Sequence, residues 1–402
     1  MRPQRIAIGS KAKKSGTYFD RHSYPVTTNA AVRRSADPGE VEITMPIENK
    51  TVSVSTLLGL AVIGMALGLP GPAPAKSSSA TTQTTQLKEE GFIQIGGIGQ
   101  WVTIKGDDKR NPVILFLHGG PGDAGSPFAE SVFGTWEKDF TLVQWDQRGA
   151  GRTYGKTGPS IEPTMTLDRM VQDGIEVSEY LTKHLGKKKI ILVGGSWGSI
   201  LGIYMAKQRP DLFYAYIGMA QLVNERAGQA ASYGRVLQLA RADDDQKTVK
   251  ALEALGPPPW DSLRKWPVFH KALLAYQAKR VTAASPPITI DPAYASVAER
   301  AQYDDADDFS FVHFFGMTMS GPMETVDLPA LGTDFAIPIF FVQGQEDINA
   351  LPELAKAYLD TIKAPQKQFI SVPGTGHEPS AESLKVTLEL LTKQVRPNAI
   401  ER

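Results

Sequence analysis

The chain has 402 residues, of which 42% are apolar and 21% are charged, as in an ordinary globular protein rather than a disordered or collagen-like one. Its 43 basic and 43 acidic residues cancel, so it lacks the basic excess typical of a nucleic-acid-binding domain. Without cysteine it can form no disulfide, thiolate nucleophile or cysteine-ligated metal site, and six histidines are too few to favour a histidine-rich one. We therefore expect no metal, no cofactor and no nucleic-acid partner.

The N-terminal part changes character abruptly. Residues 1–50 carry nine Lys or Arg against five Asp or Glu and show no sustained periodicity, which predicts a disordered extension. Residues 52–69 contain no charge, and the small residues 73–75 (Ala-Pro-Ala) follow, as in a signal peptide with its cleavage site. Translation from Met45 would leave the short leading region typical of such a signal.

Residues 51–75 therefore predict export to the periplasm or the medium, with a flexible linker at 76–87 rich in Ser, Thr and Gln. An uncleaved N-terminal membrane anchor at 52–69 is the alternative, because 18 apolar residues are barely enough to span a bilayer. A cytoplasmic location is the remaining interpretation.

From residue 88 onward, strand-like and helix-like segments alternate. Short apolar runs of strand length stand at 91–95, 101–105, 113–117, 140–145, 190–193, 215–219, 337–342 and 368–372. Helical segments stand at 167–185, 199–208, 351–362 and 383–395. Continuous rather than alternating apolar strands indicate a sheet covered on both faces. The pattern predicts an α/β fold with a mostly parallel, doubly wound sheet.

One region interrupts this alternation. Residues 222–330 contain helical patterns and proline clusters at 256–260 and 285–287 but no confident strand. We expect a helical cap there, inserted between two parts of the core at 88–221 and 331–402.

The sequence GGSWG at 194–198 follows an apolar strand and precedes a helix. A Gly-x-Ser-x-Gly in this context is a nucleophile elbow, in which Ser196 sits at a strained turn and small neighbours allow backbones to approach closely. The helix start behind Ser196 favours negative charge, so the N–H of Trp197 is a candidate oxyanion-hole donor.

The sequence HGGPG at 118–122 directly follows the strand at 113–117. The loop after this strand supplies the second oxyanion donor in proteins with such an elbow, and we assign it to Gly120. His118 closes the strand, and we expect it to brace the loop by hydrogen bonds rather than to act in catalysis.

A serine nucleophile needs a base, and the base needs an orienting carboxylate later in the chain. His377 lies in a glycine-rich loop just after the last predicted strand, where a base can reach the elbow. The acid is expected after the strand before it, at Asp347, with its neighbour Glu346 as the fallback.

The sequence WDQRGAGR at 145–152 is also dense in glycine, but no Gly-Lys-Ser/Thr follows, so it is not a phosphate-binding loop. Asp146 precedes the serine, against the order expected of the acid. We therefore expect a structural turn in which Asp146 and the arginines of this block pair with one another.

Together the sequences at 118–122, 145–152 and 194–199 resemble the hallmark sequences of the proline iminopeptidase group of α/β-hydrolases. The resemblance covers about residues 88–221 and 331–402. It implies the α/β-hydrolase fold with an inserted cap, a catalytic triad of Ser196, Asp347 and His377, and removal of N-terminal proline from short peptides.

The resemblance is weaker for the substrate. In that group, carboxylates of the cap bind the free α-amine of the substrate, and Glu225 and Glu324 are the candidates here. The GPPPW sequence at 256–260 resembles one found in a broader set of such hydrolases. We expect an aminopeptidase that acts on a small peptide. The alternative is an esterase or lactonase that acts on small apolar esters. A third hypothesis is a catalytically silent binding protein with the same fold.

Overall fold

The computed structural model describes residues 86–400. The predicted extension, signal segment and nearly all of the linker fall in residues 1–85, outside the described residues, so these features and the predicted export stay predictions. Between residues 86 and 400, no helix is both long enough and apolar enough to cross a membrane.

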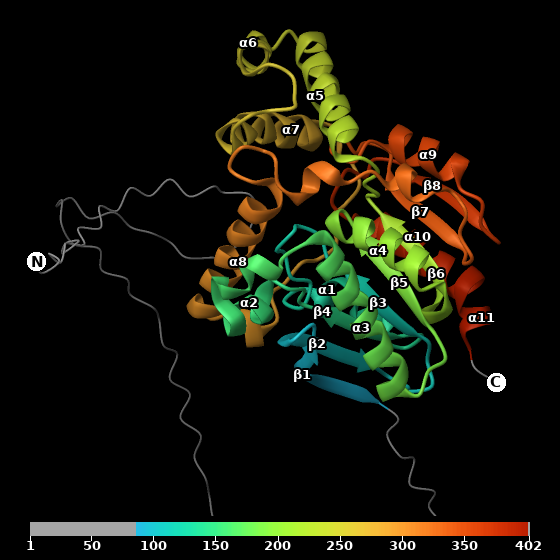
Figure 1. The fold of residues 1–402 in the computed structure, drawn as a ribbon. Coiled ribbons are helices and arrows are strands. Elements are labelled where there is room, and N and C mark those ends of the chain that lie inside the picture. Colours follow the sequence, from blue (N-terminus) through green and yellow to red (C-terminus); the bar gives the residue numbers. More distant parts are fainter. Residues whose placement is uncertain (1–85, 401–402) are drawn as a thin grey trace, which may run out of the picture. The chain divides into compact units, whose positions relative to one another are not determined.

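The described residues form an eight-stranded sheet in the order β1-β2-β4-β3-β5-β6-β7-β8 (Figure 1). The strands are β1 (Leu87–Ile95), β2 (Ile98–Gly106), β3 (Val113–Leu117), β4 (Thr141–Trp145), β5 (Ile190–Gly195), β6 (Phe213–Met219), β7 (Ile339–Gly344) and β8 (Lys367–Val372). The strand β2 pairs antiparallel with β1 and with β4, and the other neighbours are parallel. The predicted mostly parallel sheet is confirmed.

Alternate residues of the central strands face two separate cores. Leu115 and Leu192 belong to one core, whereas their neighbours Phe116 and Val193 belong to the other. Helices α3 (Leu167–Leu185), α4 (Trp197–Gln208) and α9 (Pro352–Thr361) cover the first face. The second is covered by α1 (Ala129–Phe133), α10 (Ala381–Leu390) and α11 (Arg396–Ala399). Burial on both faces explains why the strands are apolar throughout.

The structure shifts some predicted boundaries. Strand β7 begins at Ile339 rather than at residue 337, because Pro338 has no N–H to donate to a ladder. Helix α4 begins at Trp197, immediately behind Ser196. The predicted helix at 383–395 begins at Ala381 and passes into a π-helical turn at Leu391–Val395. The short helices α1 and α2 (Gly151–Thr157) were not predicted, since they are too short to show a period.

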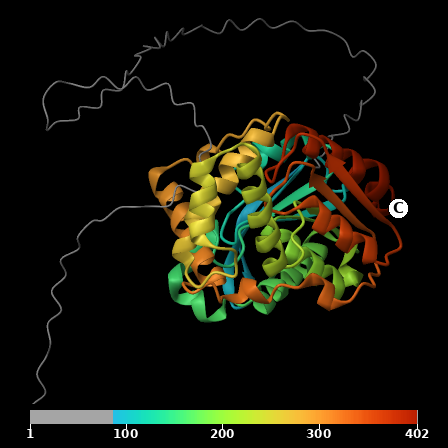
Figure 2. The same ribbon diagram turned by 90° about the horizontal axis from the view of Figure 1, so that it is seen from above.

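Between β6 and β7 the chain forms a helical cap (Figures 1 and 2). Its helices are α5 (Glu225–Ala242), α6 (Gln246–Leu255), α7 (Trp266–Arg280) and α8 (Val297–Phe315). The chain enters and leaves side by side: an isolated antiparallel bridge joins Asn224 to Asp327, and the N–H of Leu328 donates to Val223 O at 2.9 Å. We call this paired segment the neck of the cap.

The far end of the cap lies on the core. Helix α8 packs against α2 (Figure 1), and Gln302 of α8 donates to Gly151 O at 3.0 Å. The irregular segment 281–296, which joins α7 to α8, includes the 3₁₀ turn η5 (Pro292–Tyr294). This arrangement brings the cap directly over the loops at the carboxyl ends of the strands.

Candidate active site

Ser196 occupies the sharp turn between β5 and α4. Its φ of 48° and ψ of −118° are rare for a residue with a side chain, and its N–H donates to Met219 O at 3.0 Å. A Cβ on Gly198 would lie 2.0 Å from Leu117 O, and one on Gly194 would lie 2.5 Å from Gly198 O. A Cβ on Gly195 would meet nothing within 4 Å, so only the two outer glycines of the motif are required by space.

The structure brings the three predicted triad residues together. Ser196 Oγ lies 3.0 Å from His377 Nε2. The other ring nitrogen of His377, Nδ1, lies 3.1 Å and 3.3 Å from the two carboxylate oxygens of Asp347. The three residues follow β5, β7 and β8, whose carboxyl ends meet at the same edge of the sheet.

Asp347 is only 1% exposed, so its charge needs compensating donors. One carboxylate oxygen accepts the backbone N–H groups of Asn349 at 2.9 Å and Ala350 at 2.8 Å. The other accepts Gln343 Nε2 at 3.2 Å. These donors orient the carboxylate toward His377. The predicted fallback, Glu346, instead directs its side chain to Arg280 of α7.

The pKa of His377 is set by two opposing effects. Burial disfavours the imidazolium, but the charge of Asp347 and its hydrogen bond outweigh burial and raise the pKa to about 9. The imidazolium formed when His377 accepts a proton is therefore stabilised in place.

The predicted oxyanion donors lie at the start of the helix behind Ser196 and in the loop after β3. Trp197 is the first residue of α4, so its N–H has no acceptor within the helix. Gly120 has a φ of +109°, which favours glycine. Its neighbour Gly119 lies beside Ser196, since a Cβ on Gly119 would lie 3.7 Å from Ser196 Cβ.

His118 makes the hydrogen bonds expected of a residue that braces the loop. Its Nδ1–H donates to Gly119 O at 2.8 Å, and its Nε2 accepts the N–H of Gln147 at 3.1 Å. Burial lowers its pKa to about 4, so the ring is neutral. Gln147 was not identified from the sequence, yet its side-chain oxygen also accepts Trp197 Nε1–H at 2.9 Å. It thereby links the oxyanion loop to the elbow.

The predicted pairing of Asp146 with arginine side chains is wrong. Asp146 accepts the hydroxyl of Ser126 and the backbone N–H of Arg152 at the start of α2, and burial raises its pKa to about 6. The arginine side chains are long enough for their guanidinium groups to reach neighbouring helices instead. Arg148 pairs with Asp173 of α3 at 2.7 Å, and Arg152 pairs with Glu299 of α8 at 3.0 Å.

The two carboxylates considered for the substrate amine both lie at the neck. Glu225 opens α5, and burial, assisted by the charge of Glu324, raises its pKa to about 7 although Gln229 donates to it at 2.7 Å. Glu324 lies in the turn Pro322–Thr325, where its carboxylate accepts Arg226 Nε at 2.7 Å.

A third carboxylate, Asp123, was missed because nothing in the local sequence marks it. It follows the oxyanion loop, and its Oδ2 would lie 3.6 Å from a Cβ on Gly119, which itself adjoins Ser196. Tyr303 of the cap donates to it at 3.3 Å. Asp123 therefore places an acidic side chain close to Ser196.

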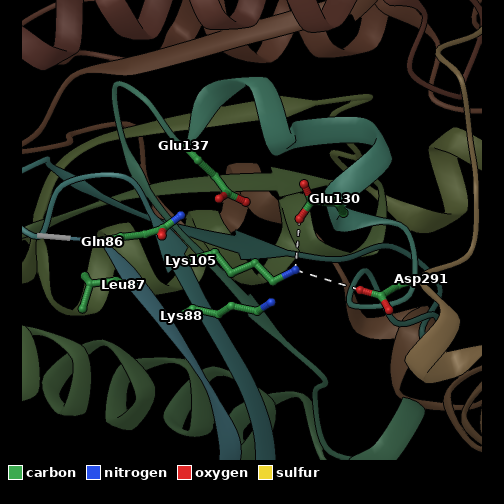
Figure 3. Close-up of a pocket in the computed structure, with 7 residues that line it drawn as sticks. All are labelled: Gln86, Leu87, Lys88, Lys105, Glu130, Glu137 and Asp291. Carbon is green, nitrogen blue, oxygen red and sulfur yellow. Dashed lines mark hydrogen bonds and ion pairs between the residues drawn. The ribbon is translucent and has the colours of Figure 1, made fainter. Parts of the chain in front are cut away.

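A pocket of about 370 Å³ lies elsewhere, beside β1 and β2 (Figure 3). Lys105 extends between Glu130, at 3.1 Å, and Asp291, at 4.0 Å. Lys105 thus holds two of the lining carboxylates in ion pairs, and the lining includes no serine, threonine or histidine. Among residues 86–400, no cluster of three or more His, Asp or Glu side chains is arranged to hold a metal ion.

Comparison with known proteins agrees with this fold. A family model described as the alpha/beta hydrolase fold matches residues 112–384. The probable aminopeptidase YbaC of Bacillus subtilis is 27% identical over 323 residues, which cover 76% of this chain and 95% of that protein. The proline iminopeptidase of Clostridioides difficile is 24% identical, covering 77% and 98%.

A solved structure, the proline iminopeptidase of Mycobacterium smegmatis, superposes with a TM-score of 0.56 at 19% identity. The match covers 76% of this chain and 98% of that one. At this identity the likeness supports the fold.

Proposed function

The chain belongs to the α/β-hydrolase fold family as a proline iminopeptidase-like member, and from this premise we propose that it is a serine hydrolase with Ser196, Asp347 and His377 as its triad. The observation that supports this most directly is the 3.0 Å separation of Ser196 Oγ from His377 Nε2, with Asp347 on the opposite ring nitrogen.

In the proposed reaction, Ser196 Oγ attacks the substrate carbonyl carbon while His377 Nε2 accepts its proton. The N–H groups of Trp197 and Gly120 stabilise the oxyanion, a contribution of about 3–4 kcal/mol for each donor. The intermediate then collapses, and His377 protonates the leaving group. Water, deprotonated by His377, hydrolyses the acyl-enzyme and restores Ser196.

We propose that the substrate is a short peptide with a free N-terminal proline or small residue. Glu225 and Glu324 at the neck supply negative charge for the α-ammonium group. One observation favours the alternative, an esterase or lactonase: Arg226 already neutralises Glu324. That ion pair is weak evidence, because Arg226 is 70% exposed and exposed pairs are easily displaced.

The test compares three substrates on the full-length protein: a prolyl anilide with a free amine, its N-acetylated twin and a short-chain ester. An aminopeptidase should prefer the free amine by about 10- to 100-fold in kcat/KM, the size of one charged hydrogen bond. This preference should weaken below the Glu225 pKa of about 7, because the carboxylate becomes protonated.

Two variants serve as controls. Ser196→Ala should abolish turnover of all three substrates, and clear residual activity would refute the nucleophile assignment. Glu225→Gln should raise KM for the free amine by roughly ten-fold while leaving ester hydrolysis within about two-fold. Equal turnover of the acetylated substrate, or activity on the ester alone, would establish the esterase reading instead.

A further inference from the structure

Gln277 is a buried side chain of the cap helix α7, only 9% exposed, that reaches into the core. Its Nε2 donates to Glu346 O at 2.7 Å, and its Oε1 accepts the N–H of Ile348 at 3.0 Å. One amide group therefore bonds to the main chain on both sides of Asp347.

The same amide also touches the loop that carries the base. A Cβ on Gly376, the residue before His377, would lie 2.5 Å from Gln277 Nε2. The contact leaves no room for a side chain at Gly376, so the amide of Gln277 packs closely against the main chain of this loop.

Other contacts at the end of α7 point to the same two loops. The N–H groups of Thr282 and Ala283 donate to Gly374 O at 2.9 Å and 3.0 Å. Arg280, in the last turn of α7, pairs with Glu346. The end of α7 thus contacts two loops from the side of the cap: the loop 344–348, which carries Asp347, and the loop 374–377, which carries His377.

We propose that Gln277 is a positioning residue for the triad, and that the cap therefore supports the chemical step in addition to selecting substrate. The inference rests on the proposed roles of Asp347 and His377. Gln343 and two backbone N–H groups orient the Asp347 carboxylate from the core, and Gln277 fixes the backbone of Asp347 from the opposite side. Loss of the amide removes the two hydrogen bonds that fix the backbone around Asp347 and the packing against Gly376, so the His377 ring is held less firmly against Ser196.

The test is Gln277→Leu, which keeps the size of the side chain and removes both hydrogen bonds. We expect kcat to fall by about 10- to 100-fold, the cost of a misplaced catalytic group, with KM within about two-fold. The rate at which an alkyl fluorophosphonate labels Ser196 should fall by a similar factor, and the acid limb of the pH–rate profile should move. A purely structural role would change the melting temperature without moving these readouts.

The matched control is Gln302→Leu, the same substitution at another cap-to-core hydrogen bond, from α8 to Gly151, remote from both loops. It should leave labelling and kcat within about two-fold of wild type. Wild-type kcat and labelling in folded Gln277→Leu would overturn the proposal, as would an equal loss in Gln302→Leu.

If Gln277→Leu does not fold, Gln277→Glu retains the size and the acceptor for Ile348. It loses only the donor to Glu346 O, so labelling should slow even at pH values above the acid limb, where His377 is neutral, and an unchanged plateau rate would overturn the proposal. Fluorophosphonate labelling also separates the two proposals, since it needs no knowledge of the natural substrate. Failure of the wild-type protein to react at Ser196 would refute the triad itself, whereas normal labelling of Gln277→Leu would refute only the role of Gln277.

Discussion

At the scale of single residues, Asp347 and His377 are closely coupled. Asp347 is buried, accepts three hydrogen bonds besides that of His377, and raises the pKa of the imidazole to about 9 against the effect of burial. A base must be neutral to accept the serine proton, so kcat/KM should rise with pH until His377 is deprotonated.

Asp347→Asn should lower kcat by roughly 10⁴, because the amide no longer holds the correct tautomer of His377. It should also move the acid limb to lower pH, since the charge that stabilises the imidazolium is gone. Both effects are measured from pH–rate profiles with a saturating substrate. Glu346→Gln is the neighbouring control, and a larger loss there than in Asp347→Asn would reverse the assignment of the acid.

Local sequence was sufficient to find some residues of the candidate site but not others. Ser196 and His377 lie in short glycine-rich sequences at the ends of apolar strands, a pattern visible within ten positions. Gln147 contacts a residue 50 positions away, and Gln277 contacts one 71 positions away. Only the fold brings these pairs of residues together. No periodicity or spacing marks either glutamine.

At the scale of elements, the elbow shows how a strand, a turn and a helix constrain one another. The outer glycines of the motif let the start of α4 approach the end of β3, as the 2.0 Å distance from a Cβ on Gly198 to Leu117 O shows. Because the middle glycine, Gly195, has open space around its Cβ position, the motif offers its own control.

Gly198→Ala should destabilise the protein by about 1–3 kcal/mol or more, since the added methyl group must push backbone apart. It should also reduce kcat by displacing Ser196. Gly195→Ala should change the free energy of unfolding by less than about 0.5 kcal/mol. Urea denaturation measures both, and equal effects of the two substitutions would show that the close approach at Gly198 is not what the motif requires.

Long or strongly apolar elements were predicted well because both faces of the sheet are covered. The helix at 167–185 and the strand at 113–117 match to the residue. The short helix α2 escaped prediction because its sequence, rich in glycine and threonine, shows no apolar period. Its position depends on contacts with α8 and with Asp146. No local sequence pattern predicts these contacts.

At the scale of the whole molecule, Arg152 fastens the cap to the core. Its guanidinium lies 4.7 Å from the ring centre of Trp101 in β2 and 4.0 Å from that of Tyr294 in the 281–296 segment. It also pairs with Glu299 of α8 at 3.0 Å and donates to Ala293 O at 2.7 Å. One side chain therefore joins the antiparallel strand β2 to η5 and to α8.

Arg152→Ala should lower the free energy of unfolding by roughly 2–3 kcal/mol, from two ring contacts and one partly buried ion pair. Amide hydrogen exchange should accelerate in a peptide covering 289–303 and stay unchanged in α3. Arg209→Ala, which removes more exposed ion pairs with Asp211 and Glu179, should cost less than about 1 kcal/mol. If exchange accelerated equally in α3, Arg152 would be stabilising the core rather than fastening the cap.

The neck of the cap has a consequence for how one cap can replace another during evolution. Since the chain leaves β6 and returns to β7 through two paired segments, a shorter or longer insertion can be joined there without disturbing the strand order. The end of α7, however, bonds to the loops of Asp347 and His377. A chimera that receives a foreign cap would keep the sheet but lose the amide at position 277. In a lineage that exchanges caps, the segments 277–283, 344–348 and 374–377 would have to change together.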